Sequence, residues 1–245
     1  MKKIACIIPA RLKSTRFPRK MLVFLKGKPL LQWVWEAAQL VPEFNTIAFA
    51  VDSNETADLI HTFGGKYYMT SESCPSGTDR LIEVMQSGSV EADIWVNWQG
   101  DEPFINAQMI HDLLQTCDTE PSDLWTLRKK ISKTEEINSP QTPKVVCDVR
   151  GYALYFSRST IPYYRDEKDE AKKVFYKHIG IYAYTQEALK KISTLAPSDL
   201  EQAEQLEQLR FIGNDLRIRV HETNYDVFGI DLLEHVAKAE ARLEL

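Results

Sequence analysis

The sequence predicts an α/β fold in which a mostly parallel, twisted sheet is flanked by helices. Short apolar runs rich in isoleucine and valine alternate with amphipathic segments, as they do in parallel sheets covered by helices. The length of 245 residues suits a single domain with one sizeable insertion. The alternation changes after residue 120. We therefore expect a core over about residues 1–124 and 186–245, and a smaller mixed α/β subregion over about residues 125–185.

The first half contains the elements that the sequence defines most clearly. They are, in chain order, a strand at Ile4–Ile8, a helix over about Leu30–Leu40, a strand at Thr46–Val51, a helix over Thr56–Phe63 and a strand at Ile94–Asn97. The polar run Asp52-Ser53-Asn54-Glu55 supplies a start signal for the second helix. Gly64-Gly65 supplies its stop, because glycine tolerates the left-handed conformation that commonly ends helices.

The second half is expected to contain a hairpin, a charged loop and two further helices. These are the strands Lys144–Asp148 and Tyr152–Phe156 around Val149-Arg150-Gly151, the loop Tyr163–Lys173, a helix from Ser198 through Leu209, and a final helix at Leu232–Leu245. Ser198 and Glu201 have the spacing of a capping box. The dense charge of the loop predicts a mobile segment, with a solvated face as the alternative.

Composition and charge exclude several classes of protein. The net charge of -5 argues against nonspecific nucleic-acid binding, which needs a basic excess or a basic stripe. No apolar run approaches the roughly 20 residues of a spanning helix, so no membrane insertion is expected. The apolar run at the start meets Pro9 and Arg11 before a signal-peptide core is complete, and a cytoplasmic location is the default expectation.

The cysteines predict neither a zinc site nor a disulfide framework. Cys6, Cys74, Cys117 and Cys147 are far apart, form no Cys-x-x-Cys pair, and have no histidine at zinc-ligand spacing. We interpret them as free thiols. Cys6 and Cys147 stand in strand-like apolar runs, where they are expected to be small buried side chains.

A cationic loop follows the first strand. The segment Pro9–Lys20 contains five lysines and arginines within ten residues, together with hydroxyl side chains. Ligands of open α/β sheets bind at the carboxyl ends of strands, and clustered like charges repel one another unless an anion joins them. The loop therefore indicates polyphosphate binding, with a solvated basic loop as the alternative. Neither a Walker motif nor Gly-x-Gly-x-x-Gly is present.

Two adjacent carboxylates follow the strand at Ile94–Asn97. In Gln99-Gly100-Asp101-Glu102-Pro103 the acids are presented where the chain leaves the sheet. One or two carboxylates suit Mg²⁺, which takes its remaining ligands from phosphates and water. The alternative is a turn acid that caps the next helix. Considered together with the cationic loop, the pair favours metal binding.

These motifs, in this order, resemble the CMP-Kdo synthetases, the 3-deoxy-manno-octulosonate (Kdo) cytidylyltransferases. The resemblance spans nearly the whole chain and is carried by Ile7–Lys20, Gly27–Leu30, Met69-Thr70, Ser76–Arg80, Gln99–Pro103, Lys144–Val146, Tyr152–Arg158, His178–Tyr182 and Leu206–Arg210. It implies a nucleotidyltransferase fold similar to that of the A-type glycosyltransferases. It also implies a dimer, with the subregion at about 125–185 contributing to sugar binding and dimerisation.

The resemblance also implies roles for individual residues. CTP would be bound by Ala10, Arg11, Ser14, Arg16, Lys20, Ser76, Gly77, Thr78, Arg80 and Gln99. The sugar acid would be bound by Gln99, Arg158, His178, Tyr182, Glu207 and Gln208, with the arginine suited to its carboxylate. Asp101 and Asp231 would hold Mg²⁺, and Lys20 would act with them in catalysis.

The implied reaction is attack of the anomeric hydroxyl of a 2-keto-3-deoxy sugar acid on the α-phosphorus of CTP. It gives a CMP-sugar, for lipopolysaccharide synthesis, and pyrophosphate. Positioning and charge neutralisation do most of such work, so no side chain is assigned as a nucleophile. His178 is expected either to form a hydrogen bond with the sugar or to act as a general base.

Three segments depart from the family pattern. Arg19 stands where the family has glycine, Leu232–His235 replaces the usual run after the aspartate, and Trp125–Lys130 carries three cations. Arg19 puts the local backbone in question, because arginine lacks the freedom of glycine at positive φ. The departures leave open an analogue such as 8-amino-Kdo, a nonulosonate, a different nucleotidyltransferase reaction, or a non-catalytic binding protein.

Overall fold

The computed structural model describes residues 2–14, 16–165 and 172–243, and the chain divides into two compact units. The first unit comprises Met1–His111 and Asp226–Leu245, and the second comprises Asp112–Tyr225. The second unit is wider than the subregion predicted at about 125–185. The predicted role of that subregion in sugar binding and dimerisation stays a prediction.

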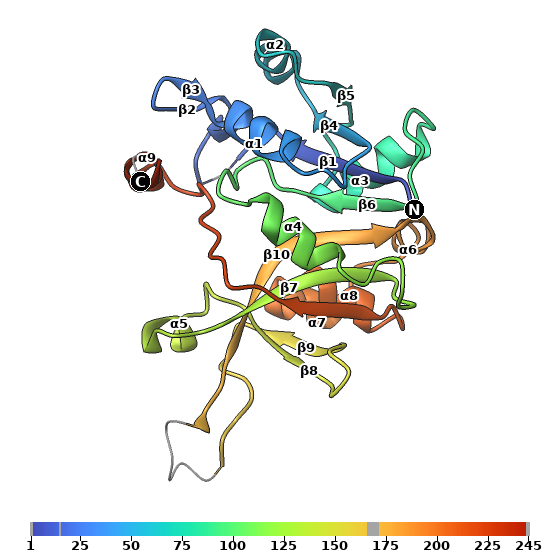
Figure 1. Cartoon of the computed structure of the whole chain (residues 1–245), viewed down its shortest axis with the longest axis vertical. Coiled ribbons are helices and arrows are strands. Elements are labelled where there is room, and N and C mark those ends of the chain that lie inside the picture. The colour runs from blue at the N-terminus through green and yellow to red at the C-terminus, as the bar shows by residue number, and fades with distance from the viewer. Residues whose placement is uncertain (1, 15, 166–171, 244–245) are drawn as a thin grey trace. The chain divides into compact units, whose positions relative to one another are not determined.

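A parallel sheet forms the centre of the first unit. It contains β1 (Ile4–Ala10), β4 (Thr46–Val51), β5 (Tyr67–Met69) and β6 (Ile94–Asn97), in the order β6-β1-β4-β5 (Figure 1). Every pairing in this series is parallel. All seven residues of β1 are buried, as expected for a strand covered on both faces. The three strands predicted in this half are confirmed, and the first extends two residues further to Ala10.

Five α-helices of the described chain belong to or border the first unit. They are α1 (Leu30–Gln39), α2 (Asn54–Thr62), α3 (Gly77–Gln86) and α9 (Glu234–Arg242), with α4 (Ala107–Leu114) leading into the second unit. Of these, α1, α2 and α9 correspond to predicted helices, whereas α3 and α4 were not predicted. The hydroxyl of Ser53 accepts a hydrogen bond from the Thr56 amide at 3.2 Å and caps α2. Gly64 then closes that helix at a φ of 72°. The final helix is shorter than predicted, and Glu244 and Leu245 lie outside the described residues.

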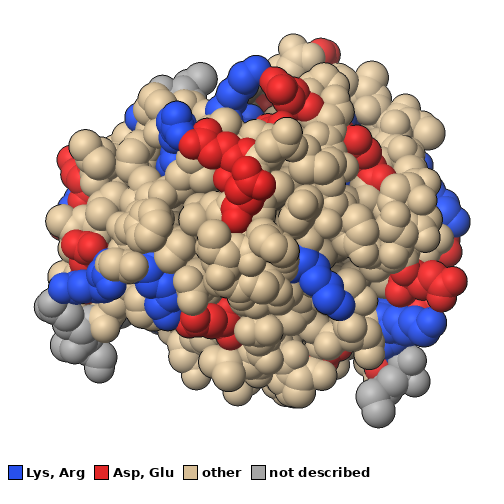
Figure 2. All heavy atoms as spheres, turned by 90° about the horizontal axis from the view of Figure 1, so that it is seen from above, with Lys and Arg blue, Asp and Glu red and all other residues tan. Residues whose placement is uncertain are grey.

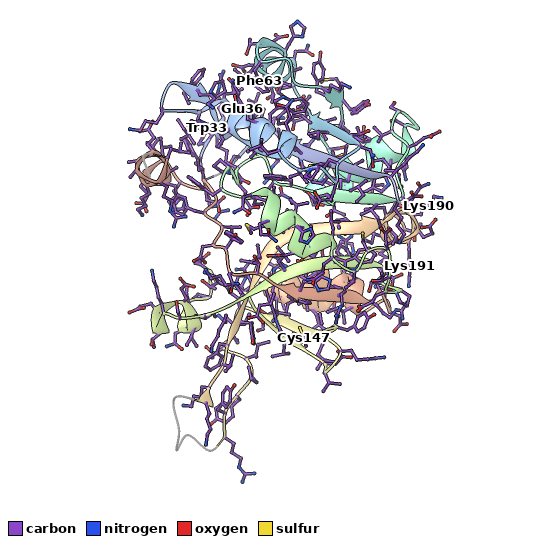
Figure 3. All side chains as sticks on the ribbon, viewed as in Figure 1. Trp33, Glu36, Phe63, Cys147, Lys190 and Lys191 are labelled. Carbon is purple, nitrogen blue, oxygen red and sulfur yellow. The ribbon has the colours of Figure 1, made fainter. Side chains whose placement is uncertain are left out.

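Short elements connect the cationic loop to α1. These are the single 3₁₀ turn η1 (Lys20–Leu22) and the two-stranded ribbon of β2 (Phe24–Leu25) and β3 (Lys28–Pro29). The Lys28 ammonium lies 3.4 Å from the ring centroid of Trp33 and 2.6 Å from Glu36, both labelled on α1 in Figure 3. These contacts fix the ribbon to the helix.

The second unit is built on a mixed sheet. It contains β7 (Leu124–Lys130), β8 (Lys144–Cys147), β9 (Ala153–Ser157), β10 (Tyr176–Thr185) and β11 (Ile218–Glu222). β10 pairs antiparallel with both β7 and β8, β8 pairs antiparallel with β9, and β11 pairs parallel with β7. The predicted hairpin is therefore confirmed as β8 and β9. The predicted α/β class is confirmed as well, with antiparallel pairings in this second sheet and in the short β2–β3 ribbon.

The helices of the second unit correct one prediction. They are α5 (Thr134–Asn138), α6 (Gln186–Ile192), α7 (Asp199–Glu204) and α8 (Gln208–Ile212). The capping box of Ser198 and Glu201 is confirmed. The single helix predicted from it through Leu209 is wrong, because Gln205 takes the left-handed conformation at φ 52° and ends α7. Of the predicted mobile loop Tyr163–Lys173, residues 166–171 lie outside the described residues.

The surface carries charges of both signs. The face drawn in Figure 2 shows lysine and arginine side chains interspersed with aspartate and glutamate. Exposed pairs within the first unit include Lys3 with Glu91 at 3.3 Å and Lys13 with Glu72 at 2.6 Å. Pairs as exposed as these contribute little stability individually. Among the described residues, no helix is both long enough and apolar enough to cross a membrane.

Candidate functional site

A polar cavity of about 220 Å³ lies at the carboxyl ends of β1 and β6. Most of the residues predicted for CTP and metal binding line it, namely Arg11, Arg16, Lys20, Ser76, Gly77, Arg80, Gln99, Asp101 and Asp231. Three other predicted CTP residues, Ala10, Ser14 and Thr78, do not line the cavity. All twelve of these residues belong to the first unit. Thr15, within the predicted phosphate motif, lies outside the described residues.

Lys20 is the centre of an ionic cluster in this cavity. Its ammonium group pairs with Asp101 and lies 3.1 Å from Asp231 Oδ1, which also accepts from Arg16 Nη2 at 3.1 Å. Lys20 is only 8% exposed. Burial opposes its charged form, but the carboxylates of Asp101 and Asp231 outweigh this effect and raise the pKa of the ammonium group. Residues far apart in the sequence thus meet at one cation.

Glu102, which the sequence pairs with Asp101 as a candidate metal ligand, adds a third carboxyl group. Burial, together with the neighbouring carboxylates of Asp101 and Asp231, raises the pKa of Glu102 to about 8. Its Oε2 atom is buried and has no hydrogen-bond partner among the described residues. The acidic-pair motif made Glu102 a candidate metal ligand, whereas the family resemblance assigned Mg²⁺ to Asp101 and Asp231 alone.

The donor set of the cavity suits a cation that phosphates help to bind. No group of three or more potential metal ligands occurs among the described residues. The convergence of Asp101 and Asp231 on Lys20 nevertheless brings two carboxylates to one place. Two carboxylates, completed by phosphate and water oxygens, fit Mg²⁺, whereas a closed protein cage does not suit it. The residues present therefore fit the implied metal.

The loop that carries Asp231 is held by a residue of the divergent C-terminal run. Nδ1 of His235 accepts a hydrogen bond from the Asp231 amide at 3.2 Å and lies 3.1 Å from the Gly229 carbonyl oxygen. The ring of His235 also packs against Phe228, with centroids 5.2 Å apart. The run Leu232–His235, which departs from the family pattern, therefore still holds the Asp231 backbone in place through His235.

The N-terminus of α3 forms another wall of the cavity. Ser76 caps the helix by accepting from the Asp79 amide at 3.2 Å, and the Asp79 carboxylate accepts in return from the Ser76 amide at 3.1 Å. The dipole and the outward-pointing amides of a helix make its N-terminus attractive to anions. A Cβ on Gly77 would lie 3.0 Å from the Gln99 side chain, and Gln99 in turn donates to Asn97 at 2.9 Å. The tight packing fixes Gln99 beside the helix.

Backbones also approach closely below the acidic pair. A Cβ on Gly100 would lie 2.9 Å from the carbonyl oxygen of Pro9, closer than real Cβ contacts allow. It would also lie 3.1 Å from Leu31 and 3.2 Å from Met21. The loop that presents Asp101 therefore rests directly on the end of β1.

Arg80 is fixed by neighbouring polar groups. It is 1% exposed and donates to Asp52 at 2.8 Å, to the Thr70 hydroxyl at 2.7 Å and to the Ser71 carbonyl at 3.1 Å. Asp52 was not identified as a site residue from the sequence, although it directly follows β4. Its position at the end of a parallel strand was the available signal.

The predicted sugar-binding residues other than Gln99 belong to the second unit. Arg158 donates to the carbonyl oxygens of Glu204 at 2.6 Å, Pro140 at 2.9 Å and Gln205 at 3.2 Å. The guanidinium group thus holds α7 to the end of β9. The assignment of Arg158 to the sugar carboxylate stays a prediction.

The remaining sugar candidates contain buried polar atoms without partners. The Tyr182 hydroxyl and Gln208 Nε2 are buried and make no hydrogen bond among the described residues. Two ring contacts and a hydrogen bond hold His178, which lies 5.4 Å from Tyr182 by ring centroids and 3.0 Å from the Thr126 hydroxyl. Burial lowers the pKa of His178 to about 3. Glu207 is less free, since it accepts from Arg210 at 3.0 Å.

The cations of Trp125–Lys130 include one with a clear structural partner. Arg128 lies 4.0 Å from the centroid of the Tyr176 ring on the adjacent strand, and 3.5 Å from Glu222. These cross-strand contacts account for its place on β7.

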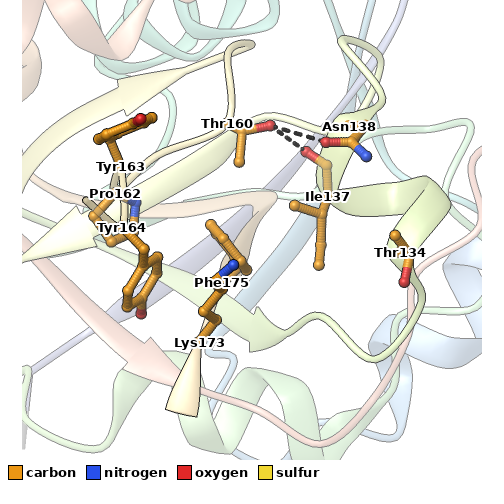
Figure 4. A pocket seen from close by; sticks show the side chains of 9 residues that line it. All are labelled: Thr134, Ile137, Asn138, Thr160, Pro162, Tyr163, Tyr164, Lys173 and Phe175. Carbon is orange, nitrogen blue, oxygen red and sulfur yellow. Dashed lines mark hydrogen bonds between the residues drawn. The ribbon is translucent and has the colours of Figure 1, made fainter. Parts of the chain in front are cut away.

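A second cavity, of about 380 Å³, lies in the second unit outside the predicted site residues. Its lining includes Ile137, Tyr163 and Phe175, and the Thr160 hydroxyl bonds the Ile137 carbonyl at 2.9 Å on one side (Figure 4). Apolar and aromatic side chains dominate the wall, and Lys173 contributes a cation. Nothing in the sequence motifs pointed to this cavity.

The cysteines show the expected chemistry. No disulfide joins them within the described part of the chain. Cys6 is fully buried in β1, and burial raises the pKa of its thiol. Cys147, labelled on β8 in Figure 3, is only partly buried, so the predicted burial holds fully for Cys6 alone.

Comparison with known proteins gives consistent matches. A family model described as cytidylyltransferase matches residues 5–218. The 3-deoxy-manno-octulosonate cytidylyltransferase of Thermodesulfovibrio yellowstonii is 45% identical over 244 residues, with 96% of each chain covered. That of Chloroherpeton thalassium is 43% identical over 244 residues, with 98% of each chain covered.

Solved structures agree with these matches. A structure of CMP:2-keto-3-deoxy-manno-octonic acid synthetase complexed with CTP has a TM-score of 0.92 and 41% identity, covering 99% of this chain and 98% of its own. The 4-diphosphocytidyl-2C-methyl-D-erythritol synthase of Anaerococcus prevotii has a TM-score of 0.66 at 14% identity and covers 100% of this chain and 99% of its own. The second likeness concerns the fold alone.

Proposed function

Since the chain belongs to the family of the 3-deoxy-manno-octulosonate cytidylyltransferases, we propose that it transfers CMP from CTP to Kdo and releases pyrophosphate. The observation that carries the proposal is the cavity at the ends of β1 and β6. It joins three cations of the loop, the N-terminus of α3 and the acids Asp101 and Asp231 in one place.

The reaction requires one bond to form and one to break at the α-phosphorus. The anomeric oxygen of Kdo forms the new bond, the bond to the bridging oxygen of pyrophosphate breaks, and the hydroxyl proton is lost to solvent or to phosphate. Arg11, Arg16 and Lys20 are placed to hold the triphosphate and to offset charge on the leaving pyrophosphate. The amides of α3 offer further donors to the nucleotide.

We further propose that the activity depends on Mg²⁺ held by Asp101 and Asp231. Such an ion would neutralise phosphate charge and help orient the reacting oxygens. The Lys20 ammonium group contacts both of these carboxylates. Lys20 therefore keeps the carboxylates together and aligned in the protein itself.

The sugar acid is proposed to bind through Tyr182 and Gln208, whose unpartnered buried atoms support this role. His178 is proposed as a hydrogen-bonding group to the sugar. A pKa of about 3 makes it a weak base near neutral pH, which disfavours general-base catalysis. We also propose that the enzyme works as a cytoplasmic homodimer in lipopolysaccharide synthesis, in keeping with the family.

A crossed substrate screen tests the proposed function. Purified protein is incubated with Mg²⁺, one of CTP, UTP, GTP or ATP, and one of Kdo, 8-amino-Kdo or a nonulosonate, and pyrophosphate release is measured. We expect CTP with Kdo to give the highest kcat/KM. Higher kcat/KM for another sugar acid would reassign the substrate, and no release with any pair would exclude catalysis.

A further inference from the structure

We infer that the junction between β4 and α2, residues 52–55, clamps both ends of the phosphate loop, and that Arg19 is a positioning residue within this clamp. The phosphate loop is defined here as residues 11–20, of which Thr15 is not described. The inference rests on the proposed function for its consequence in catalysis. Its structural part rests on two contacts, one at each end of the loop.

The first contact fixes the start of the loop. The Leu12 amide donates to Asp52 Oδ1 at 2.8 Å, and the other oxygen of the same carboxylate accepts from Arg80 Nη2 at 2.8 Å. The side chains of Asp52 and Arg80 are only 5% and 2% exposed. A buried carboxylate that accepts a hydrogen bond at each of its two oxygens is a rigid anchor. It also joins the phosphate loop to the first turns of α3.

The second contact fixes the end of the loop. The Arg19 guanidinium pairs with Glu55, in the first turn of α2. The Arg19 backbone lies in the left-handed region at φ 59° and ψ 27°, which is costly for any residue with a Cβ. The glycine-like conformation is thus retained without glycine, and the ion pair compensates for part of its cost. Arg19 therefore adopts the positive φ that the sequence had put in question.

Arg19 acts on Lys20 through the backbone. Its carbonyl oxygen accepts from the Leu22 amide at 3.0 Å, the bond that closes η1, and Lys20 is the first residue of that turn. Arg19 itself does not line the cavity that holds Lys20, Asp101 and Asp231. Holding Arg19 therefore orients the cationic group of its neighbour. A loop ordered before the triphosphate arrives loses less entropy on binding.

Glu55→Gln is the variant that tests the clamp, since it removes a charge but leaves the backbone of the loop unchanged. Because the pair is exposed, with Arg19 61% and Glu55 47% accessible, the expected rise in KM for CTP is about two- to fivefold. We expect the KM for the sugar acid to stay unchanged, and kcat to fall by no more than the same factor, because Lys20 also offsets charge on the leaving pyrophosphate. Arg19→Lys should retain most of the CTP affinity, and Arg19→Ala combined with Glu55→Gln should be no worse than the more affected single variant.

Glu91→Gln is the matched control, because Glu91 forms an exposed pair with Lys3 away from the loop. A lower KM for CTP in Glu55→Gln would overturn the inference, since it would mean that Glu55 competes with the triphosphate for Arg19. An unchanged KM would overturn it as well.

Hydrogen exchange in the unliganded protein separates this inference from the proposed function. Peptides that cover residues 11–22 should exchange faster in Glu55→Gln than in the wild type, with no change in Glu91→Gln. Faster exchange in a protein that turns over no substrate would leave the clamp standing and remove the proposed function. Unchanged exchange would exclude the clamp whatever the activity.

Discussion

Lys20, Asp101 and Asp231 show how single residues define this site. One buried ammonium group lies between two carboxylates, and Arg16 supplies a second cation at Asp231. The lysine pKa is raised by this arrangement, and the group stays charged across the neutral range. The acids are thus held in position for the proposed Mg²⁺ ion, which phosphate oxygens would help to bind.

Replacing Asp101 tests that arrangement at the residue scale. Asp101→Asn keeps the shape of the side chain but removes the charge that faces Lys20, and we expect pyrophosphate release from CTP and Kdo to fall by about 10²- to 10³-fold. The control is Asp215→Asn, at an exposed position with φ 60° where asparagine is well tolerated. Full Mg²⁺-dependent turnover in Asp101→Asn would show that the metal assignment is wrong.

Asp52 is a site residue that sequence reasoning missed. It acts through contacts made by folding, not through a motif of its own. Asp52 joins segments 40 and 28 residues away, at Leu12 and Arg80. Motif positions such as Lys20 and Asp101 could be predicted because their neighbours in the chain carry the signal. Partners that come from distant segments leave no such trace.

At the scale of elements, the strands with polar flanks were the easiest to predict, whereas β5, β7, β10 and β11 were not predicted. The bounds expected for β4 and β6 agree with the structure to the residue, because polar residues flank each buried apolar run. The break between α7 and α8 could not be anticipated in the same way. Gln205 occupies a left-handed position that usually carries glycine or asparagine, so no residue type marked the end of the helix.

Gln205→Gly is therefore expected to stabilise the protein. Glycine removes the steric cost of the left-handed conformation, which should raise the free energy of unfolding by about 0.5–1 kcal/mol. The bond from Arg158 is made to the Gln205 backbone and is retained. Gln202→Gly, inside α7, should have the opposite effect, because glycine disfavours a helix interior. Chemical denaturation of the wild type and the two variants measures both changes in the free energy of unfolding. Destabilisation by Gln205→Gly would contradict the steric cost assigned to the left-handed conformation at position 205.

At the scale of the whole molecule, acid stability depends on histidines whose rings become buried on folding. His221 is 5% exposed, and burial, aided by Arg219, lowers its pKa to about 4. Its Nε2 lies 3.0 Å from the Thr116 hydroxyl, which also accepts from Trp125 at 3.1 Å. As the pH falls, His221 in the unfolded chain takes up a proton near pH 6.5, whereas in the folded protein it does so only near pH 4.

We therefore expect the His221 contribution to stability to be complete above about pH 6.5 and to be lost as the pH falls toward 4. The loss for this one group is about 3 kcal/mol if the whole shift is realised. Denaturant titrations at several pH values would show a shallower pH dependence in His221→Gln than in the wild type. His61→Gln, at an exposed position of α2, is the control for the charge change. Equal pH dependence in all three proteins would contradict the lowered pKa.

The close approach of Gly100 to the Pro9 carbonyl oxygen limits which residues can occupy position 100. A saturation library scored by growth would find position 100 as intolerant as position 101, although glycine has no reactive group. Any side chain there must displace the end of β1 by the few tenths of an ångström, or more, that separate 2.9 Å from an ordinary contact. Invariance at position 100 would then record a steric limit, while invariance at position 101 would record chemistry. Biochemical assays on purified variants that fail to support growth would distinguish the two, since substitution at position 100 should impair folding and substitution at position 101 should impair turnover.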